Sequence, residues 1–189
     1  MTPNASILAL RKRFARFAAD QDGVSAVEFA MLLPLMLTLY LGGVEVSQAV
    51  SADRKTMQAA HTVGDLVSQS TCVMPSDMTT IFNLANDVIY PFASANLSPV
   101  VTSVAIDQNA RATVQWSLTP TGTGPYSGDV TAQIPAALLV KGTALVWAEA
   151  TYSYTPTIGY VVTGTLTLKE KIYLRPRQST TAVTYQNCT

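Results

Sequence analysis

The sequence predicts an α+β protein in which a long N-terminal helix carries a β-rich domain. Two observations predict this class: an apolar run at residues 24–44, and apolar side chains at every second position in several stretches after residue 100. The 189 residues suffice for one domain of about 100 to 150 residues plus an appendage. Only 13% of them are charged, about half of the usual share of roughly 25%. This composition, with a mean hydropathy of +0.23, indicates a segment directed to a membrane.

The apolar run at residues 24–44 predicts a single membrane-spanning helix. As a helix it is about 32 Å long, which matches a hydrocarbon core of about 30 Å. Basic residues ahead of such a helix should stay in the cytoplasm, so the C-terminal part is expected on the far side. These basic residues are Arg11, Lys12, Arg13 and Arg16.

Glu28 is the one charged residue within this apolar run. A carboxylate inside the bilayer costs about 2.5 kcal/mol or more, so it needs a compensating environment. The residues alone leave two explanations open. Glu28 lies close to the cytoplasmic interface, where water reduces the cost, or it forms a buried ion pair with another chain.

A basic leader that ends in Gly23, followed by an apolar run with glutamate at its fifth position, resembles the processing site of type IV pilin-like proteins. More specifically, residues 20–54 resemble the TadE-like family, minor pseudopilins of the bacterial tight-adherence (Tad) pilus. Phe29 departs from the major pilin of that system, which tends to carry tyrosine there. The domain of more than 100 residues after the helix is a larger departure and favours a minor subunit. The residues that carry the resemblance are Gly23, Ala26, Val27, Glu28, Phe29, Ala30, Pro34, Gly43 and Glu45.

The resemblance implies how the N-terminal segment is used. A prepilin peptidase would cut after Gly23, so that residues 1–23 are a cytoplasmic leader and Val24 is the new N-terminus. Glu28, followed by Phe29, would then pair with the free amino group of a neighbouring subunit during assembly. An α-amino group has a pKa of about 8, so it is largely protonated at neutral pH, and pairing offsets the desolvation of both charges.

The resemblance also implies partners and a location. The partners are the prepilin peptidase, the major pilin, other minor pseudopilins, the inner-membrane assembly platform and the lipid bilayer. The chain would cross the bacterial inner membrane once, with its N-terminus in the cytoplasm and its C-terminal domain in the periplasm, and the extracellular pilus is a second location.

Two alternatives belong to other classes of protein. An ordinary secretory signal is disfavoured, because the apolar run exceeds the usual length of roughly 7 to 15 residues and contains Glu28. A membrane-anchored binding or adhesion module, which never enters a pilus, remains the alternative function.

The helix is expected to continue beyond the membrane, because apolar residues recur every three or four positions as far as Val67. Pro34 and the Gly42–Gly43 pair are the expected bends. Ser76 is the expected cap of a second helix that ends near Pro91. The predicted organisation is a leader at 1–23, a transmembrane helix at 24–45, its periplasmic extension at 46–70, a second helix and linker at 71–99, and an antiparallel β-rich domain at 100–189.

Period-two patterning predicts about four strands in an antiparallel meander packed against the long helix. A hairpin turn is expected at 107–110, and strands are expected at 144–155 and around 166–174. Glu170 falls in the inward register of the last strand, so a bulge, an ion pair or a strand end is expected near it. Four residues are expected on one face of the strand after the hairpin turn: Ala112, Val114, Trp116 and Leu118.

The composition and the absence of known motifs argue against most kinds of catalytic, metal-binding and nucleic-acid-binding site that can be recognised from a sequence. The formal net charge is zero, which gives no electrostatic indication of nucleic-acid binding. His61 is the only histidine and Cys72 and Cys188 are the only cysteines, so metal sites rich in histidine or built from four cysteines are excluded within one chain. No phosphate-binding loop or nucleophile elbow occurs. We therefore expect no enzymatic activity, no catalytic residue, no metal and no cofactor.

Cys72 and Cys188 are 116 positions apart and both follow the membrane segment. Compartments beyond the cytoplasm permit disulfides, so we expect the two to be bonded. Such a bond would fasten the C-terminal segment to the region after the long helix.

Overall fold

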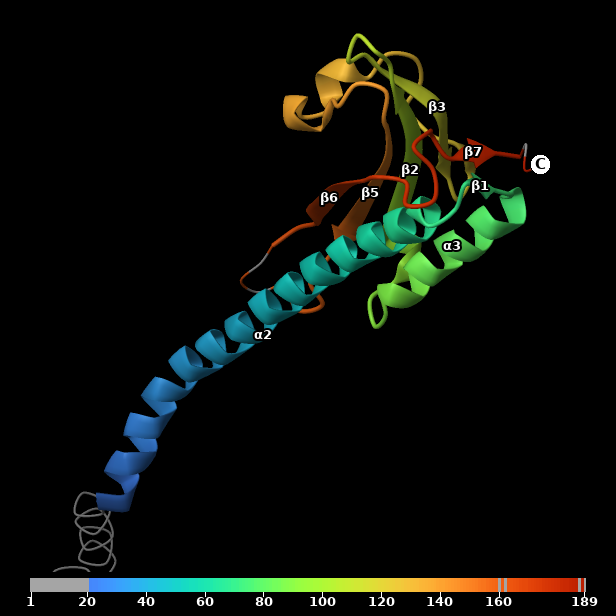
Figure 1. Cartoon of the computed structure of the whole chain (residues 1–189). Coiled ribbons are helices and arrows are strands. Elements are labelled where there is room, and N and C mark those ends of the chain that lie inside the picture. Colours follow the sequence, from blue (N-terminus) through green and yellow to red (C-terminus); the bar gives the residue numbers. More distant parts are fainter. Residues whose placement is uncertain (1–20, 160, 162, 187, 189) are drawn as a thin grey trace, which may run out of the picture.

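The structure is a computed structural model that describes residues 21–159, 161, 163–186 and 188. The predicted leader at 1–23 lies outside this part of the chain except for its last three positions. Figure 1 shows a long helix that projects from a domain built around its C-terminal half. The α+β class, with a long apolar helix, a second helix and an antiparallel sheet, is confirmed. The elements are α2 (Gln21–Ser68), β1 (Cys72–Val73), α3 (Pro75–Val88), η1 (Ser94–Asn96), β2 (Leu97–Ile106), β3 (Ala112–Thr119), β4 (Gly122–Thr123), η2 (Thr131–Gln133), η3 (Ala136–Leu138), β5 (Ala144–Tyr154), β6 (Leu166–Leu174) and β7 (Thr184–Tyr185).

Helix α2 is continuous over 48 residues, which corresponds to a length of about 72 Å. Neither Pro34 nor the Gly42–Gly43 pair interrupts it, and Figure 1 shows a helix that curves without a break. Proline removes one backbone donor, the one that would bond to the Ala30 carbonyl, and the hydrogen bonds of the neighbouring turns can persist. A single continuous helix therefore joins the apolar segment to the domain.

Helix α3 begins one residue before the predicted cap. Pro75 occupies its first turn, and the Asp77 carboxylate accepts a hydrogen bond from the Met74 amide at 2.9 Å. The prediction that Ser76 caps this helix is therefore wrong, because proline at the first helical position and an acidic residue in the first turn already satisfy the helix start. The helix ends at Val88, slightly before the predicted end, and it buries Met78, Ile81, Phe82 and Ala85.

The main sheet has five strands in the order β4-β3-β2-β5-β6, and every neighbouring pair is antiparallel. This order is not the predicted meander, because β2 lies between β3 and β5. The additional strand, β4, is only two residues long, too short for a pattern in the sequence to reveal. The chain passes from β4 to β5 through residues 124–143, which include η2 and η3.

Each face of the sheet has its own hydrophobic cluster. Val146, Ala150 and Tyr152 of β5 pack towards α2 and α3, whereas Leu145 and Trp147 of the same strand belong to a second cluster. Alternate residues of a strand point to opposite faces, so the two clusters lie on opposite sides of the sheet. The second cluster is completed by residues of the 124–143 connection, which covers the face opposite to the helices: Tyr126, Val130, Ile134, Leu138 and Leu139.

A bulge in the pairing of β3 with β2 changes which residues of β3 face the helices. Trp116 pairs with Ser103, but the next pair along β2 is Val104 with Val114, so Gln115 is the extra residue. A bulge of this kind shifts the alternation of side chains by one position. The prediction that four residues share one face is therefore wrong: Trp116 and Leu118 join the helix-side cluster, and Ala112 and Val114 join the opposite one.

Strand β6 is regular at Glu170, contrary to prediction. It pairs with β5 from Leu166 to Leu174 without a register shift, and Glu170 lies opposite Ala150. Neither a bulge nor a strand end is close, and no described residue forms an ion pair with this carboxylate. Glu170 is only half-buried, so it keeps contact with water and needs no partner inside the protein.

Candidate functional site

The N-terminal part of α2 presents apolar side chains without any covering from the rest of the described chain. This helix is long and apolar enough to cross a membrane, and its most apolar stretch has no residue buried inside the protein. Exposed apolar surface of this extent marks a surface that another phase or molecule covers. The segment therefore fits a membrane anchor. Its large exposed residues are Val24, Val27, Phe29, Met31, Leu32, Leu33, Leu35, Met36, Leu37, Leu39 and Tyr40.

The residues of the predicted cleavage and assembly site lie together at the start of this segment. Val24 and Phe29 are each 58% exposed, and apart from Gly23's chain neighbours and the adjacent helix backbone, no atom of the described residues lies within 4 Å of the position that a Cβ on Gly23 would occupy. Glu28 follows Val24 by four positions, so both lie on the same helix face one turn apart. As far as the described residues are concerned, the segment around Gly23 is thus sterically accessible to another molecule.

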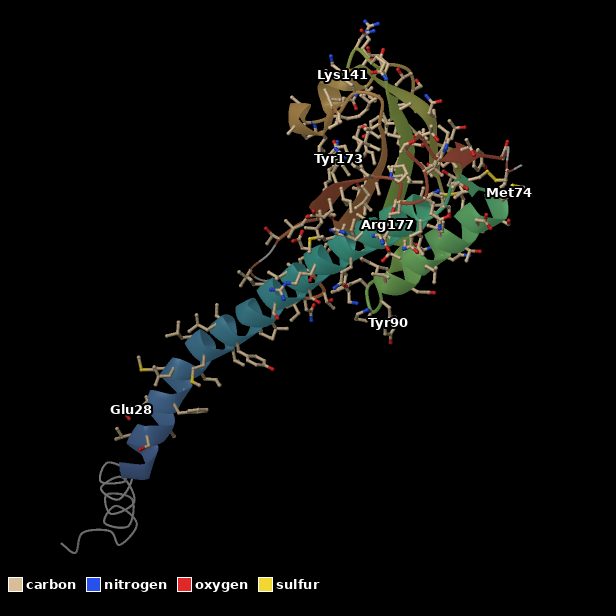
Figure 2. All side chains as sticks on the ribbon, viewed as in Figure 1. Glu28, Met74, Tyr90, Lys141, Tyr173 and Arg177 are labelled. Atoms are coloured by element: carbon tan, nitrogen blue, oxygen red, sulfur yellow. A yellow bond between two sulfur atoms is a disulfide. The ribbon has the colours of Figure 1, made fainter. Side chains whose placement is uncertain are left out.

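Glu28 has no ion-pair partner among the described residues. In Figure 2 it lies near the N-terminal end of the described helix, far from the β-rich domain. The domain therefore contributes nothing to the compensation of this carboxylate. A counter-charge has to come from the leader, from solvent or headgroups at the interface, or from another chain.

Glu45 is a functional candidate that the sequence reasoning quoted only as part of a resemblance. Its side chain is 2% exposed, and its Oε2 accepts a hydrogen bond from the Val161 amide at 2.8 Å. The carboxylate thus holds the loop between β5 and β6 onto α2, at the end of the domain nearest the apolar segment (Figure 1). A charge directly after an apolar run, two residues beyond a pair of glycines, was the signal in the sequence for this residue, but the sequence did not indicate the loop as its partner.

Gly42 permits the close approach of the same loop. A Cβ on Gly42 would lie 2.9 Å from Val161 Cγ2, which is closer than real Cβ contacts allow. Gly43, by contrast, has open space around its Cβ position. The pair therefore differs in role, since only Gly42 is required to be small.

Tyr154, at the end of β5, is buried at the base of this loop. The residue is 4% exposed, and its hydroxyl has no hydrogen-bond partner among the described residues. Burial, and secondarily the carboxylate of Glu45, raises the pKa of the Tyr154 hydroxyl.

The two cysteines that were expected to bond lie close together, just beyond the C-terminal end of α2. Cys72 and Cys188 form a disulfide with their Cα atoms 5.4 Å apart. The short strands β1 and β7 run parallel beside it, with Cys72 opposite Thr184 and Val73 opposite Tyr185. The bond joins the last described residue to the segment that directly follows the long helix.

Further contacts hold the C-terminal segment against the sheet and α2. Val183 is fully buried, and its carbonyl accepts hydrogen bonds from Ser103 Oγ at 2.9 Å and Trp116 Nε1 at 2.7 Å. Arg177 forms an ion pair with Asp65 of α2. The disulfide is thus one of several attachments.

The sheet face opposite to the helices has a cluster of aromatic and charged side chains around Trp147. Glu149 accepts a hydrogen bond from Tyr126 at 2.6 Å and pairs with Lys171 at 2.7 Å, while the Lys171 ammonium lies 4.4 Å from the centre of the Trp147 ring. Trp147 and Tyr126 stack with ring centres 4.2 Å apart. Because Trp147 is fully buried, this cluster fixes the 124–143 connection and offers no open aromatic platform.

Metal-binding chemistry finds no support in the described residues. No three histidine, cysteine, aspartate or glutamate residues among them are grouped so that they could hold a metal ion. His61 is exposed on α2.

Comparison with known proteins finds one family. The model described as "TadE: TadE-like protein" matches residues 23–65, a range that begins at the predicted cleavage site and ends within α2. No curated protein matches the chain, and no solved structure matches it. The match supports the resemblance inferred from the helix, and the family is one of components associated with the Tad pilus.

Proposed function

We propose that this chain, a TadE-like protein by the match over its helix, is a minor pseudopilin that takes part in the initiation and assembly of a Tad-type pilus. A prepilin peptidase removes residues 1–23, and Val24 becomes the mature N-terminus. The processed chain is held by α2 in the inner membrane, with its domain in the periplasm, until it joins the major pilin, other minor pseudopilins and the assembly platform.

One observation supports this proposal most strongly. The family match begins at Gly23, and in the described part of the chain the Gly23–Glu28 segment lies open on the helix without an ion-pair partner for the carboxylate. An unpaired carboxylate in an apolar segment is costly, so a protonated amino terminus from another subunit would lower the free energy of association. The β-rich domain, which lies outside the match, is the part that would distinguish this subunit from others.

The first experiment determines the mature N-terminus by mass spectrometry in cells with and without the prepilin peptidase. We expect a chain that starts at Val24, and we expect this species to disappear when the peptidase is absent. A Gly23→Leu variant should keep the leader in both strains. An intact leader in wild-type cells would favour the alternative of a membrane-anchored binding or adhesion module.

The second experiment tests the role of Glu28 in assembly. Glu28→Leu should insert into the membrane as well as the unaltered chain and should abolish or strongly reduce piliation, because the charge that attracts a neighbouring amino terminus is lost. Thr38→Leu is the matched control, since it also replaces a polar residue of the same apolar segment with leucine. Equal piliation in the two variants would contradict the ion-pair role.

The orientation is tested separately with a cysteine at an exposed position of the domain. Lys141, which Figure 2 places at the far end of the domain, is exposed. A Lys141→Cys variant should react with a membrane-impermeant maleimide in intact spheroplasts. Reaction only after lysis would place the domain in the cytoplasm instead.

A further inference from the structure

The loop between β5 and β6, of which the structure describes residues 155–159, 161 and 163–165, carries two exposed apolar side chains at the end of the domain closest to the apolar segment of α2. Ile158 and Val161 are each 50% exposed, and the loop sequence contains no charged residue. In Figure 1 the coloured parts of this loop lie beside α2, at the ends of β5 and β6. Single exposed apolar residues are common on protein surfaces, so the position of these two side chains along α2 has to carry the argument.

The position of the loop along α2 is fixed by two contacts. Val161 packs on Gly42, where a Cβ would come within 2.9 Å of its Cγ2, and the Val161 amide donates a hydrogen bond to Glu45. These contacts lie on successive turns of the same helix. The loop therefore has a defined position along the axis of α2.

This position along α2 coincides with the expected edge of the hydrocarbon core of the bilayer. A hydrocarbon core of about 30 Å accommodates about 20 helical residues, so a span that starts at Val24 ends near Val44. Gly42 lies within the last turn of this span. Tyr40, which is 68% exposed, lies at the depth where tyrosine side chains are enriched in membrane proteins.

We propose that the β5–β6 loop is a second membrane contact, in which Ile158 and Val161 enter the interfacial region of the leaflet on the domain's side. The occupant of this surface is phospholipid, because the apolar loop is continuous with the lipid-facing helix at that depth. Gly42 and Glu45 position the loop and thereby fix the orientation of the domain relative to the membrane surface. The inference rests on membrane insertion of α2 and not on a role in a pilus.

The test uses the full chain in vesicles of phosphatidylethanolamine and phosphatidylglycerol. With the native disulfide formed, a bimane label is attached to Ile158→Cys, and quenching by lipids with a nitroxide close to the headgroup is measured. Lys141→Cys serves as the control for a position away from the membrane, and Leu35→Cys as the control for insertion of the helix. We expect the label at 158 to lose most of its fluorescence, the label at 141 to lose none, and the label at 35 to be quenched by nitroxides deep in the bilayer.

Three results would overturn the inference. If the label at 158 behaves like that at 141 while position 35 is quenched, the loop is in water although the helix is inserted. If the quenching at 158 changes when the protein is diluted with additional lipid while the quenching at 35 does not, a second copy of the chain covers the loop. If position 35 is not quenched either, the helix is not inserted and the loop has no membrane beside it.

A pair of glycine variants tests whether α2 positions the loop. Gly42→Val should displace Val161 and remove most of the lipid quenching at 158, while quenching at 35 stays unchanged. Gly43→Val is the matched control, because its Cβ position is open, and it should leave both signals as they are. Full quenching at 158 in the Gly42→Val chain would show that the loop reaches the lipid without this docking and would contradict the positioning role.

Discussion

Glu45 shows what a single carboxylate does at the junction of the apolar segment and the domain. It is almost completely buried and accepts the backbone hydrogen bond that holds the β5–β6 loop. Glu45→Ala leaves the Val161 amide without its acceptor, and an unsatisfied buried donor costs about 1 to 3 kcal/mol. We expect the free energy of unfolding of the full chain in detergent micelles, measured by urea denaturation, to fall by that amount.

The matched variant for this prediction is Glu45→Gln, which removes the charge but keeps an oxygen acceptor in the same place. It should lose clearly less stability than Glu45→Ala. Equal losses in the two variants would indicate that the charge, and not the hydrogen bond to Val161, carries the effect.

Tyr126 makes the stability of the domain sensitive to alkaline pH. Burial and the hydrogen bond to the Glu149 carboxylate raise the pKa of its hydroxyl well above the ordinary value of 10.0. Because the folded chain holds the proton more tightly than the unfolded chain, the stabilisation is complete below pH 10 and decreases as the pH rises above it. Urea denaturation of the full chain in micelles between pH 9 and about 11 should show this decrease.

Tyr126→Phe provides the comparison at the same residue. This variant has no phenol to ionise, so its free energy of unfolding should decline less steeply over the alkaline range. Tyr154 and Tyr173 also have raised pKa values and will keep part of the slope. An unchanged slope in Tyr126→Phe would show that Tyr126 is not the group responsible.

Individual residues differ in how far the sequence could predict them. The cysteine pair was predictable because only two cysteines exist and both follow the membrane segment. The burial of Glu45 was not, since its hydrogen-bond donor is 116 positions away in the chain. The assembly role of Glu28 stays a prediction, because its expected partner belongs to another molecule.

At the scale of elements, the contact between α2 and the sheet depends on Gly64. A Cβ at this position would lie 3.1 Å from both Ala148 Cβ and Leu174 Cδ1. Gly64→Leu should push the helix away from β5 and β6 and lower the free energy of unfolding by about 1 to 3 kcal/mol, the usual cost of overpacking a core. Thermal unfolding of the full chain, followed by near-ultraviolet circular dichroism, measures the effect.

Gly43→Leu is the control for this element, because it adds the same side chain to the same helix at a position with open space. Both variants replace glycine inside a helix and gain helix propensity. Only Gly64→Leu should destabilise the packing. A similar loss in Gly43→Leu would mean that the added side chain acts through the helix itself.

The elements themselves were largely predictable, since each carries a local period. α2, α3 and the four longer strands follow from apolar residues spaced by three or four positions or by two. The bulge at Gln115 was not predictable, because it depends on how β3 aligns with β2 and not on the composition of β3 alone. The start of α3 was missed for a local reason, since Pro75 and Asp77 together define it better than Ser76 does.

At the scale of the whole molecule, the disulfide between Cys72 and Cys188 restrains the unfolded chain. A loop of 116 residues corresponds to a stabilisation of up to about 5 kcal/mol in the chain-entropy treatment. The double variant Cys72→Ser/Cys188→Ser should therefore unfold at a clearly lower urea concentration. It should still fold, because Val183, β7 and Arg177 attach the C-terminal segment independently.

Reduction of the unaltered chain with dithiothreitol should reproduce the stability of this double variant, and the double variant itself should not respond to the reductant. A double variant as stable as the oxidised chain would show that the other attachments already restrain the C-terminal segment fully.

The global arrangement was the least accessible to prediction. The class followed from two local patterns, but the strand order required knowing that β2 pairs with both β3 and β5. Such pairings link residues far apart in the chain, and nothing in the period of a strand specifies its neighbour. The 124–143 connection illustrates this. Its apolar residues become buried only when they pack on the sheet face opposite to the helices, which requires the strands to be paired first.

The covalent link between Cys72 and Cys188 also determines how the molecule would bear a mechanical load. Cys72 lies four residues beyond the end of α2, so tension applied between that helix and Cys188 passes through the sulfur bridge. The chain from Val73 to residue 187, which contains the whole sheet, is then a side branch that carries no force. If a subunit is extracted from the membrane by its helix while Cys188 is held, the force passes through the disulfide. The sheet is then not unfolded by this force.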